Sequence, residues 1–429
     1  MEQVTVLVGA QWGDEGKGKV IDILTEDVKY IARYQGGNNA GHTVVIGEDK
    51  YVLHLVPSGI LHEGKICIIG HGVVVDPKAL IEEVELLKSK GITVDGRLKV
   101  SDKAHVIFPY HCKLDELREE RKKGKKIGTT KKGIGPCYGD KVARVGIRIG
   151  DLFDKDYFRS RLENVIGEKN AIFKNLYGFE GFSSEEIFQD YLKYADHLKD
   201  YVCDTVTLLN EALGKGESIL FEGAQGTFLD VDYGTYPFVT SSNATAGGAC
   251  TGAGIGPSRV NRVIGVVKAY TTRVGEGPFP TEFGPDLMEA IRQKGGEFGA
   301  TTGRARRCGW FDSVLVKNSV EINGIDKVVI TKLDVLDELE TIKVCTAYEY
   351  DGKTYYGVPG IPGFLESCRP VYEEHPGWQQ DTSKVTSYEQ LPENARKYLQ
   401  RVKGLIGTDI MLVSVGKSRR QTLIYPDNA

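Results

Sequence analysis

The chain has 429 residues, and its 55 Lys and Arg against 59 Asp and Glu give a formal net charge of −4. This balance provides no overall cationic surface, so nonspecific binding to nucleic acid or to an anionic membrane is not the expected function. With 41% hydrophobic, 9% aromatic and 27% charged residues, the composition is typical of globular proteins and excludes a disordered, collagen-like or coiled-coil chain.

Glycine is the unusual component, with 52 residues in the chain. This abundance indicates numerous loops or backbone that approaches ligands closely. The eight cysteines include no CxxC pair, which favours free thiols in a reducing compartment. The sequence contains neither a charged-then-apolar leader nor an apolar run of the roughly 18 residues that a membrane span needs, so we expect a cytoplasmic protein.

The first predicted elements are a strand over residues 3–9, a glycine-rich loop over 11–17 and a helix from 18 to 24. Pro77 at the start and Gly91 beyond the end mark a helix over 77–90. Further short apolar or β-branched runs predict strands at 30–34, 66–69, 73–75, 218–221, 263–267, 327–330 and 409–415, and a hairpin at 44–55. Strands that alternate with helices predict an α/β fold with a large, mainly parallel sheet flanked by helices.

No Pro/Gly-rich linker divides the chain, so we expect a single large α/β domain over residues 1–429. Residues 154–213 are helical by pattern, and we expect a helical insertion around 109–214. The densest basic stretch, residues 121–132, has seven Lys or Arg and no acid. It is either a solvated helix end or a phosphate-facing loop, and the pattern alone leaves both interpretations open.

The sharpest motif is QWGDEGKGK at residues 11–19, between the first strand and the first helix. Gly13, Gly18 and Lys19 match the GxxxxGK spacing of a phosphate-binding P-loop, in which backbone N–H groups and a helix N-terminus bind phosphate. Val20 stands where that motif has the Ser or Thr that binds Mg²⁺, so Asp14 is the expected replacement ligand. The competing interpretation is a plain glycine-rich turn.

A second polar loop, QGGNNAGHT at residues 35–43, follows the strand predicted at 30–34. Open α/β sheets bind ligands at the carboxyl ends of their strands, so this loop is expected to line the same crevice as the first. His42 can serve there as a general acid to Asp14 as general base. A structural role for this single histidine stays open.

Three more loops combine glycine with hydroxyl, amide or guanidinium groups, at residues 127–136, 222–243 and 298–307. Together with the first two loops they predict polyanion chemistry, since the last of them carries three arginines suited to carboxylate or phosphate. The sequence TKLD at 331–334 has the form of a guanine-reading loop, because the Asp carboxylate can accept from the guanine N1–H and 2-amino groups. Residues 414–416 follow the last predicted strand and are expected at the same base.

Seven segments, in this order over essentially the whole chain, closely resemble the adenylosuccinate synthetase family: QWGDEGKGK, QGGNNAGHT, GTTKKGIGP, EGAQGT, GTYPFVTSSN, EFGATTGRARR and TKLDVLD. The resemblance implies a GTP-dependent ligase of purine biosynthesis that joins IMP to L-aspartate through 6-phosphoryl-IMP and releases GDP and phosphate. It also implies an α/β fold distantly similar to P-loop NTPases, Mg²⁺ as the metal, and a homodimer.

The resemblance carries residue roles onto matching positions of this sequence. Asp14 is expected to take the N1 proton of IMP, and Asp14 and the Gly41 carbonyl are the expected Mg²⁺ ligands. The catalytic residues expected by resemblance are Asp14, Lys17, His42 and Gln225.

The binding residues follow in the same way. Those expected for GTP are Gly13, Asp14, Glu15, Gly16, Lys17, Gly18, Lys19, Arg306, Lys332, Leu333, Asp334, Ser414, Val415 and Gly416. Those expected for IMP are Asp14, Asn39, Ala40, Gly41, His42, Thr130, Arg144, Gln225, Thr240 and Arg304, with Arg144 reaching the IMP of the neighbouring subunit. Those expected for L-aspartate are Ala300, Thr301, Thr302, Gly303, Arg304, Ala305 and Arg306.

Two other function classes compete with the ligase. A GTP-binding switch would release phosphate without IMP and aspartate, whereas a ligase would release almost none. A nucleic-acid-binding module that uses residues 121–132 would bind oligonucleotides with a strong salt dependence, and the net acidic chain disfavours it.

Overall fold

The computed structural model describes residues 3–39, 41–46, 49–121, 128–299 and 303–426. Its centre is a ten-stranded sheet with the order β20-β19-β15-β11-β1-β10-β2-β5-β7-β9. All neighbouring strands in it pair in parallel except β19 and β20. The structure therefore confirms the predicted α/β class.

The strands of this sheet are β1 (Val4–Gly9), β2 (Tyr30–Arg33), β5 (Ile66–Ile69), β7 (Leu98–Ser101), β9 (Val202–Cys203), β10 (Ile219–Glu222), β11 (Arg262–Lys268), β15 (Lys327–Thr331), β19 (Asp409–Ser414) and β20 (Thr422–Ile424). Seven of them follow the predicted runs closely, whereas β7, β9 and β20 were not predicted. Smaller sheets contain β3 (His42–Ile46), β4 (Asp49–Leu53), β6 (Val74–Val75), β8 (His105–Val106), β12 (Thr271–Arg273), β13 (Arg307–Gly309), β14 (Phe311–Asp312), β16 (Thr341–Tyr350), β17 (Lys353–Tyr355) and β18 (Arg369–Pro376).

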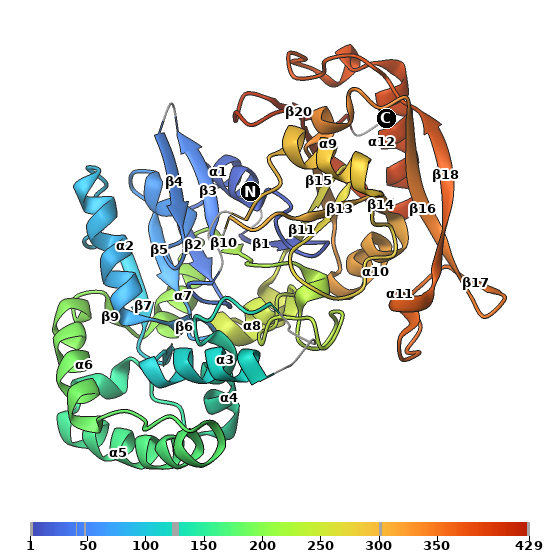
Figure 1. The fold of residues 1–429 in the computed structure, drawn as a ribbon. Coiled ribbons are helices and arrows are strands. Elements are labelled where there is room, and N and C mark those ends of the chain that lie inside the picture. Colours follow the sequence, from blue (N-terminus) through green and yellow to red (C-terminus); the bar gives the residue numbers. More distant parts are fainter. Residues whose placement is uncertain (1–2, 40, 47–48, 122–127, 300–302, 427–429) are drawn as a thin grey trace.

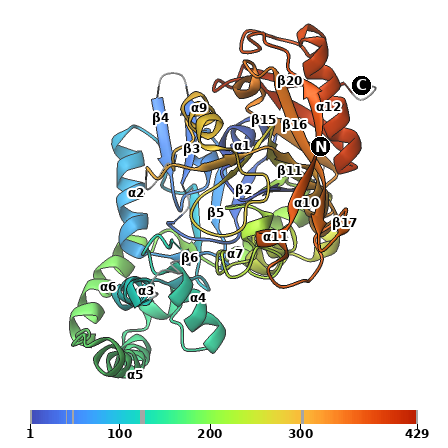
Figure 2. The ribbon, with the colours of Figure 1, turned by 45° about the vertical axis from the view of Figure 1, so that its right-hand side comes forward.

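Helices cover both faces of the main sheet. They are α1 (Lys17–Thr25), α2 (Pro77–Ser89), α3 (Pro109–Arg121), α4 (Ile134–Ala143), α5 (Lys155–Ile172), α6 (Ser184–Leu198), α7 (Thr205–Gly214), α8 (Gly247–Ala253), α9 (Pro285–Gly295), α10 (Ser313–Asn323), α11 (Phe364–Ser367) and α12 (Glu393–Ile406). Helices α3 to α6 form a lobe at one side of the molecule, and β16 to β18 lie at the other side (Figures 1 and 2). No helix in the described ranges is long and apolar enough to cross a bilayer.

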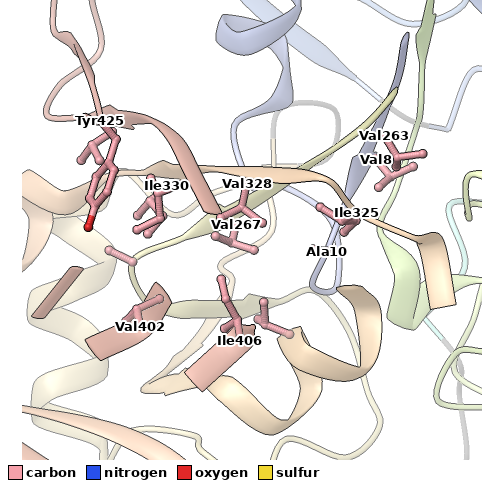
Figure 3. Close-up of a cluster of buried hydrophobic side chains, with 14 of the residues drawn as sticks. Val8, Ala10, Val263, Val267, Ile325, Val328, Ile330, Val402, Ile406 and Tyr425 are labelled. Atoms are coloured by element: carbon pink, nitrogen blue, oxygen red, sulfur yellow. The ribbon is translucent and has the colours of Figure 1, made fainter. Parts of the chain in front are cut away.

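Side chains along each parallel strand point alternately to the two faces of the main sheet, and both faces are buried. Val6 and Val8 of β1 belong to the hydrophobic cluster under α7, α8, α10 and α12, whereas Leu7 belongs to the cluster under α1 and α2. Figure 3 shows the first cluster, where Val402 and Ile406 of α12 face the sheet. Each fully buried side chain of this size contributes about 1.5–3 kcal/mol relative to exposure.

Local signals placed several elements correctly. Asp76 caps α2 by accepting from the Ala79 N–H at 3.2 Å, Pro77 is its first residue, and Gly91 beyond its end has a φ of 80°. The predicted hairpin forms as β3 and β4. The strand predicted at 73–75 is a two-residue strand, β6, which pairs with β8 outside the main sheet.

The region predicted as a helical insertion contains α3 to α7. It also contributes β9, which pairs in parallel with β7 at the edge of the main sheet. The chain therefore returns to the sheet within the region around 109–214. The antiparallel strands β16 to β18 were not predicted.

Candidate functional site

The predicted loops meet at one edge of the main sheet. The P-loop follows β1, the second polar loop follows β2, the Glu222–Asn243 region starts at the end of β10, and TKLD begins at the end of β15. Because all these strands are parallel and β1 lies between β10 and β11, their carboxyl ends share one edge. The sheet topology thus collects segments that are hundreds of residues apart.

Glu15 of the P-loop accepts hydrogen bonds from the backbone of the same loop. Gly13, Asp14 and Gly16 have left-handed backbones, with φ of 82°, 58° and 89°. The Glu15 carboxylate is fully buried, and its Oε1 accepts from the backbone N–H of Gln11 at 3.1 Å and of Gly13 at 2.8 Å. Glu15 was predicted as a GTP contact, and the structure places its carboxylate inside the loop.

The two lysines of the P-loop point to different partners. Lys17 donates to Glu15 Oε2 at 2.7 Å and to the Gln225 carbonyl at 2.5 Å. Lys19 donates to Ser414 Oγ at 2.8 Å and to the Gly416 carbonyl at 3.1 Å. Burial lowers the pKa of Lys19 to about 8, against the opposing charge of Asp334. Lys17 therefore joins the P-loop to the loop after β10, and Lys19 joins it to the loop after β19.

Asp14 forms an ion pair with Arg306 across the site. Arg306 Nε donates to Asp14 Oδ2 at 2.7 Å, and its Nη1 donates to Glu297 Oε2 at 2.7 Å. The Asp14 side chain is 35% exposed, so its carboxylate can be reached by a ligand. The expected general base and the expected substrate-binding arginine are thus direct neighbours.

His42 is buried beside Glu222, the last residue of β10. Its Nδ1 contacts Glu222 Oε1, and Glu222 also accepts from the Ser58 backbone N–H at 2.8 Å and from Ser58 Oγ at 3.0 Å. Burial lowers the pKa of His42, although the Glu222 carboxylate opposes this shift. With the Nδ1–H assigned to Glu222, Nε2 is the ring nitrogen left to exchange a proton, and it donates when the ring is an imidazolium, the form that the Glu222 carboxylate stabilises.

Glu222 and Arg33 form a charged layer behind His42. Burial raises the pKa of Glu222, but His42 and then Arg33 outweigh it, so the net shift is downward and the carboxylate is ionised. Arg33 is fully buried, lies opposite Glu222 in the β2–β10 register, and donates from Nη1 to the His54 carbonyl. Sequence reasoning assigned no role to either residue, although an acid and an arginine at the ends of apolar strands were a visible signal.

Several buried acceptors in these loops have no hydrogen-bond partner among the described residues. Buried polar atoms are normally paired, so unpaired ones at a sheet edge indicate the positions of ligand groups. They are Asn38 Oδ1, Asn39 Oδ1, Gln225 Oε1 and Asp334 Oδ1.

The TKLD loop borders a cavity of about 430 Å³. Asp334 lines it together with Lys294 of α9, Asp337, Glu338 and residues 379–383. Burial raises the pKa of Asp334. Leu333 is fully buried beneath the loop and Lys332 has a left-handed backbone, with φ of 58°, so the loop turns sharply at the end of β15.

Comparison with known proteins identifies the family. The family model described as adenylosuccinate synthetase matches residues 6–423. Adenylosuccinate synthetases of Heliobacterium modesticaldum and Geobacillus kaustophilus are each 55% identical, over 97% of this chain and 98% and 97% of theirs. The solved structure of the fully ligated enzyme from Plasmodium falciparum is 40% identical with a TM-score of 0.92, covering 99% of this chain and 100% of that chain.

The chain belongs to the adenylosuccinate synthetase family. The resemblance stated from seven short segments is therefore confirmed over nearly the full length. Succinoaminodeoxyadenylate synthetase of cyanophage S-2L, at 20% identity and a TM-score of 0.62, shares the fold.

The family's expected aspartate loop lies beside the expected IMP loop. Arg304 Nη1 donates to the Gly128 carbonyl at 3.0 Å, and the Gly303 backbone N–H donates to the Gly299 carbonyl at 2.8 Å. Ala305 bridges to Phe298 and closes the base of the loop. The remaining predicted residues Ala40, Ala300, Thr301 and Thr302 lie outside the described residues.

Three more residues predicted to contact IMP, Thr130, Thr240 and Arg144, lie on segments outside the P-loop. Thr130 and Thr240 are half-buried, and Thr240 Oγ1 contacts Ser242 Oγ at 3.5 Å. Arg144 is exposed at the C-terminal end of α4, with φ of 67°. Its guanidinium makes no hydrogen bond or ion pair with any residue that the structure describes.

Proposed function

We propose that this chain catalyses the GTP-dependent ligation of IMP and L-aspartate to adenylosuccinate, with GDP and phosphate as the other products. This is the reaction that its family name describes, on the route from IMP to AMP. The observation that carries the proposal is the meeting of Asp14, the His42–Glu222 pair and Asp334, whose Oδ1 has no partner among the described residues, at one sheet edge.

Activation of IMP begins at Asp14. Its carboxylate accepts the N1 proton of IMP, so negative charge develops on O6 and makes that oxygen a nucleophile. The ion pair with Arg306 supports this role, since it holds Asp14 at the centre of the site. Asp14 must exchange the arginine for substrate before the proton moves.

The γ-phosphoryl group of GTP is then transferred to O6: O6 attacks the γ-phosphorus, and the bond from that phosphorus to the β,γ-bridging oxygen breaks as GDP leaves. Lys17 and the P-loop backbone stabilise the charge on the transferred group. His42 supplies a hydrogen bond or proton through Nε2, while Glu222 fixes the ring through Nδ1 and stabilises the charge that then develops. The products of this step are GDP and 6-phosphoryl-IMP.

The aspartate amine then attacks C6. A C–N bond forms, the C6–O bond breaks, and O6 leaves with the phosphate. Arg304 and Arg306 are suited to bind the aspartate carboxylates, because planar guanidinium groups match carboxylates in a bidentate geometry. Gln225 and Asn39, whose side-chain oxygens are buried and unpaired, are suited to orient the purine.

Nucleotide selection depends on Asp334. Asp334 lines the cavity next to TKLD, its buried Oδ1 has no partner among the described residues, and its carboxylate can accept from guanine N1–H and the 2-amino group. Adenine lacks this pair of donors. Lys332, Ser414 and Gly416 lie around the same base site through their contacts with Glu297 and Lys19.

Mg²⁺ fits the P-loop through Asp14. Mg²⁺ in nucleotide enzymes is usually held by one or two carboxylates, nucleotide phosphates and water. The partly exposed Asp14 carboxylate suits such a shared site, and the Gly41 carbonyl is the second proposed protein ligand. When bound, the ion neutralises phosphate charge during transfer.

The proposed functional unit is a homodimer. The exposed guanidinium of Arg144, which pairs with none of the described residues, supports a contact outside its own chain. In the dimer, each chain supplies Arg144 to the IMP phosphate at the other chain's site. Mixed dimers of Arg144→Ala and Asp14→Ala test this arrangement, since one of their two sites is intact. We expect partial activity to return, and no return after confirmed subunit exchange contradicts a shared site.

The test of the activity is phosphate release from GTP with Mg²⁺, in a full matrix with and without IMP and L-aspartate. We expect release only with both substrates, matched one-to-one by adenylosuccinate. Release from GTP alone, unchanged by either substrate, would overturn the ligase and favour a GTP switch.

A further inference from the structure

Glu297 lies at the base of the expected aspartate loop and is fully buried. Its Oε1 accepts from Lys268 Nζ at 2.9 Å, Tyr270 OH at 2.5 Å and Lys332 Nζ at 2.8 Å. Its Oε2 accepts from Lys268 Nζ at 2.8 Å and Arg306 Nη1 at 2.7 Å. One carboxylate thus holds three cationic side chains and a phenol.

The partners of Glu297 come from three functional segments. Lys332 belongs to the guanine-reading TKLD loop, and Arg306 closes the aspartate loop and pairs with Asp14 of the P-loop. Lys268 is the last residue of β11 and is also fully buried. Glu297 therefore joins the base site to the aspartate site through one carboxylate, with Lys332 on Oε1 and Arg306 on Oε2.

We propose that Glu297 is a positioning residue that couples occupancy of the guanine site to the affinity of the aspartate site. This inference rests on the proposed function of the same site. Glu297 touches no reacting atom, and it acts through Arg306 and Lys332.

The geometry of Arg306 supplies the mechanism. Its guanidinium is shared between Asp14 and Glu297, at 2.7 Å from each. When substrate competes for Asp14, the Nε edge of Arg306 becomes available to an incoming carboxylate. Glu297 keeps the Nη1 edge fixed, so the guanidinium stays in place for that carboxylate.

Lys332 connects the TKLD loop to Glu297. Its Nζ also donates to the Gly295 carbonyl at 2.7 Å, at the end of α9, from which the aspartate loop departs. A base bound against Asp334 orders the TKLD loop and thereby Lys332. The shared Glu297 carboxylate and the Gly295 carbonyl transmit this order to the base of the aspartate loop.

The test is calorimetric titration of L-aspartate into the full-length protein saturated with IMP and Mg²⁺, with and without GDP. In the wild type we expect GDP to tighten aspartate binding at least about fivefold, within the usual range of coupling between sites. In Glu297→Gln, which keeps the shape and removes the charge, we expect the ratio to fall to about one.

Two control variants separate coupling from a general loss of stability. Tyr270→Phe removes one neutral donor from Glu297 and leaves all its cations, so we expect the ratio to persist. Asp312→Asn removes a buried carboxylate elsewhere, whose contacts are the Leu315 backbone N–H and Tyr348 OH, and it is also expected to keep the ratio.

If Glu297→Gln does not fold, Lys332→Met, titrated at a GDP concentration shown to saturate the variant, removes the contacts of the guanine loop with Glu297 and Gly295 and is expected to lower the ratio to about one as well. A wild-type ratio of one, or an unchanged ratio in either Glu297→Gln or Lys332→Met, overturns the coupling. If phosphate release still requires both IMP and aspartate, the ligase stands and only the coupling fails. If the wild type binds no aspartate under any condition, both fall.

Discussion

The helical lobe and the sheet edge both bury charged groups, but they satisfy them differently. In the lobe, Asp140 accepts from Lys169 Nζ at 2.5 Å and contacts His111 Nε2 at 3.0 Å. His111 Nδ1 in turn accepts from the Phe108 backbone N–H at 2.9 Å. Every polar atom named in this cluster has a partner within the chain.

At the sheet edge, by contrast, buried acceptors of Asn39, Gln225 and Asp334 have no partner within the described part of the chain. An unpaired buried polar atom costs free energy that folding alone does not recover. Pairing therefore distinguishes the Asp140 cluster from the sheet edge, although Tyr110 OH of the lobe is also buried without a hydrogen-bond partner among the described residues. Substitutions at the sheet edge should therefore lower activity, whereas a substitution in the Asp140 cluster should lower stability.

The largest effect is expected for Asp14→Asn. Loss of the general base should lower kcat by about three orders of magnitude, because positioned proton transfer contributes roughly 10²–10⁴-fold. Steady-state adenylosuccinate formation measures it, and the melting temperature should stay close to wild type since Asp14 is partly exposed. Turnover within tenfold of wild type would remove Asp14 from the mechanism.

The next effect concerns the support of His42. Glu222→Gln keeps the size of the side chain but removes the charge that stabilises a protonated imidazole. We expect kcat to fall about 10–100-fold, a part of the usual general-acid contribution, while KM for GTP changes little. A rise in KM with unchanged kcat would show that Glu222 serves binding instead.

Base selection is the third target. Asp334→Asn replaces an acceptor by an amide donor, so we expect KM for GTP to rise about 10–100-fold. XTP, which presents a carbonyl at C2, should regain part of the lost efficiency. Competition kinetics with both nucleotides measures the change, and an unaltered preference for GTP would place the base elsewhere.

The matched change in the lobe is Asp140→Asn. It leaves Lys169 buried beside a neutral amide, and breaking a buried pair in this way typically costs about 3–5 kcal/mol. We expect a lower melting temperature with kcat per folded enzyme within about twofold of wild type. A large loss of kcat in the folded variant would contradict the assignment of this cluster to structure.

The same cluster gives a pH dependence. Burial alone would raise the pKa of Asp140, but His111 and Lys169 hold its net value below the ordinary one. A depressed folded pKa stabilises the fold above the unfolded pKa of about 3.9, and this contribution is lost as pH falls through the folded value. Acid melting curves of wild type and Asp140→Asn should therefore converge below about pH 4.

Local patterns were sufficient for much of the fold. The β1–P-loop–α1 unit and α2 carry their signals within a few residues, such as Pro77 and Gly91. Seven strands of the main sheet were predicted because buried parallel strands are continuous apolar runs, whereas β7, β9 and β20 were not predicted. Strands β16 to β18 were missed because their half-exposed, charged residues give no such run.

The site was predictable as a set of loops but not as a set of contacts. The pairs His42–Glu222 and Asp14–Arg306 join residues 180 and 292 positions apart, and no local pattern encodes such a pairing. Glu297 was part of a quoted motif, yet its four partners come from β11, the segment after it, TKLD and the aspartate loop. The roles assigned to the site residues stay predictions.

The most direct test of the central claim uses IMP labelled with ¹⁸O at position 6. If O6 attacks GTP and later leaves with the transferred phosphoryl group, the phosphate released in the complete reaction carries one ¹⁸O from IMP. Mass spectrometry of the phosphate reads the label. Unlabelled phosphate, formed together with adenylosuccinate, would contradict activation of IMP through O6.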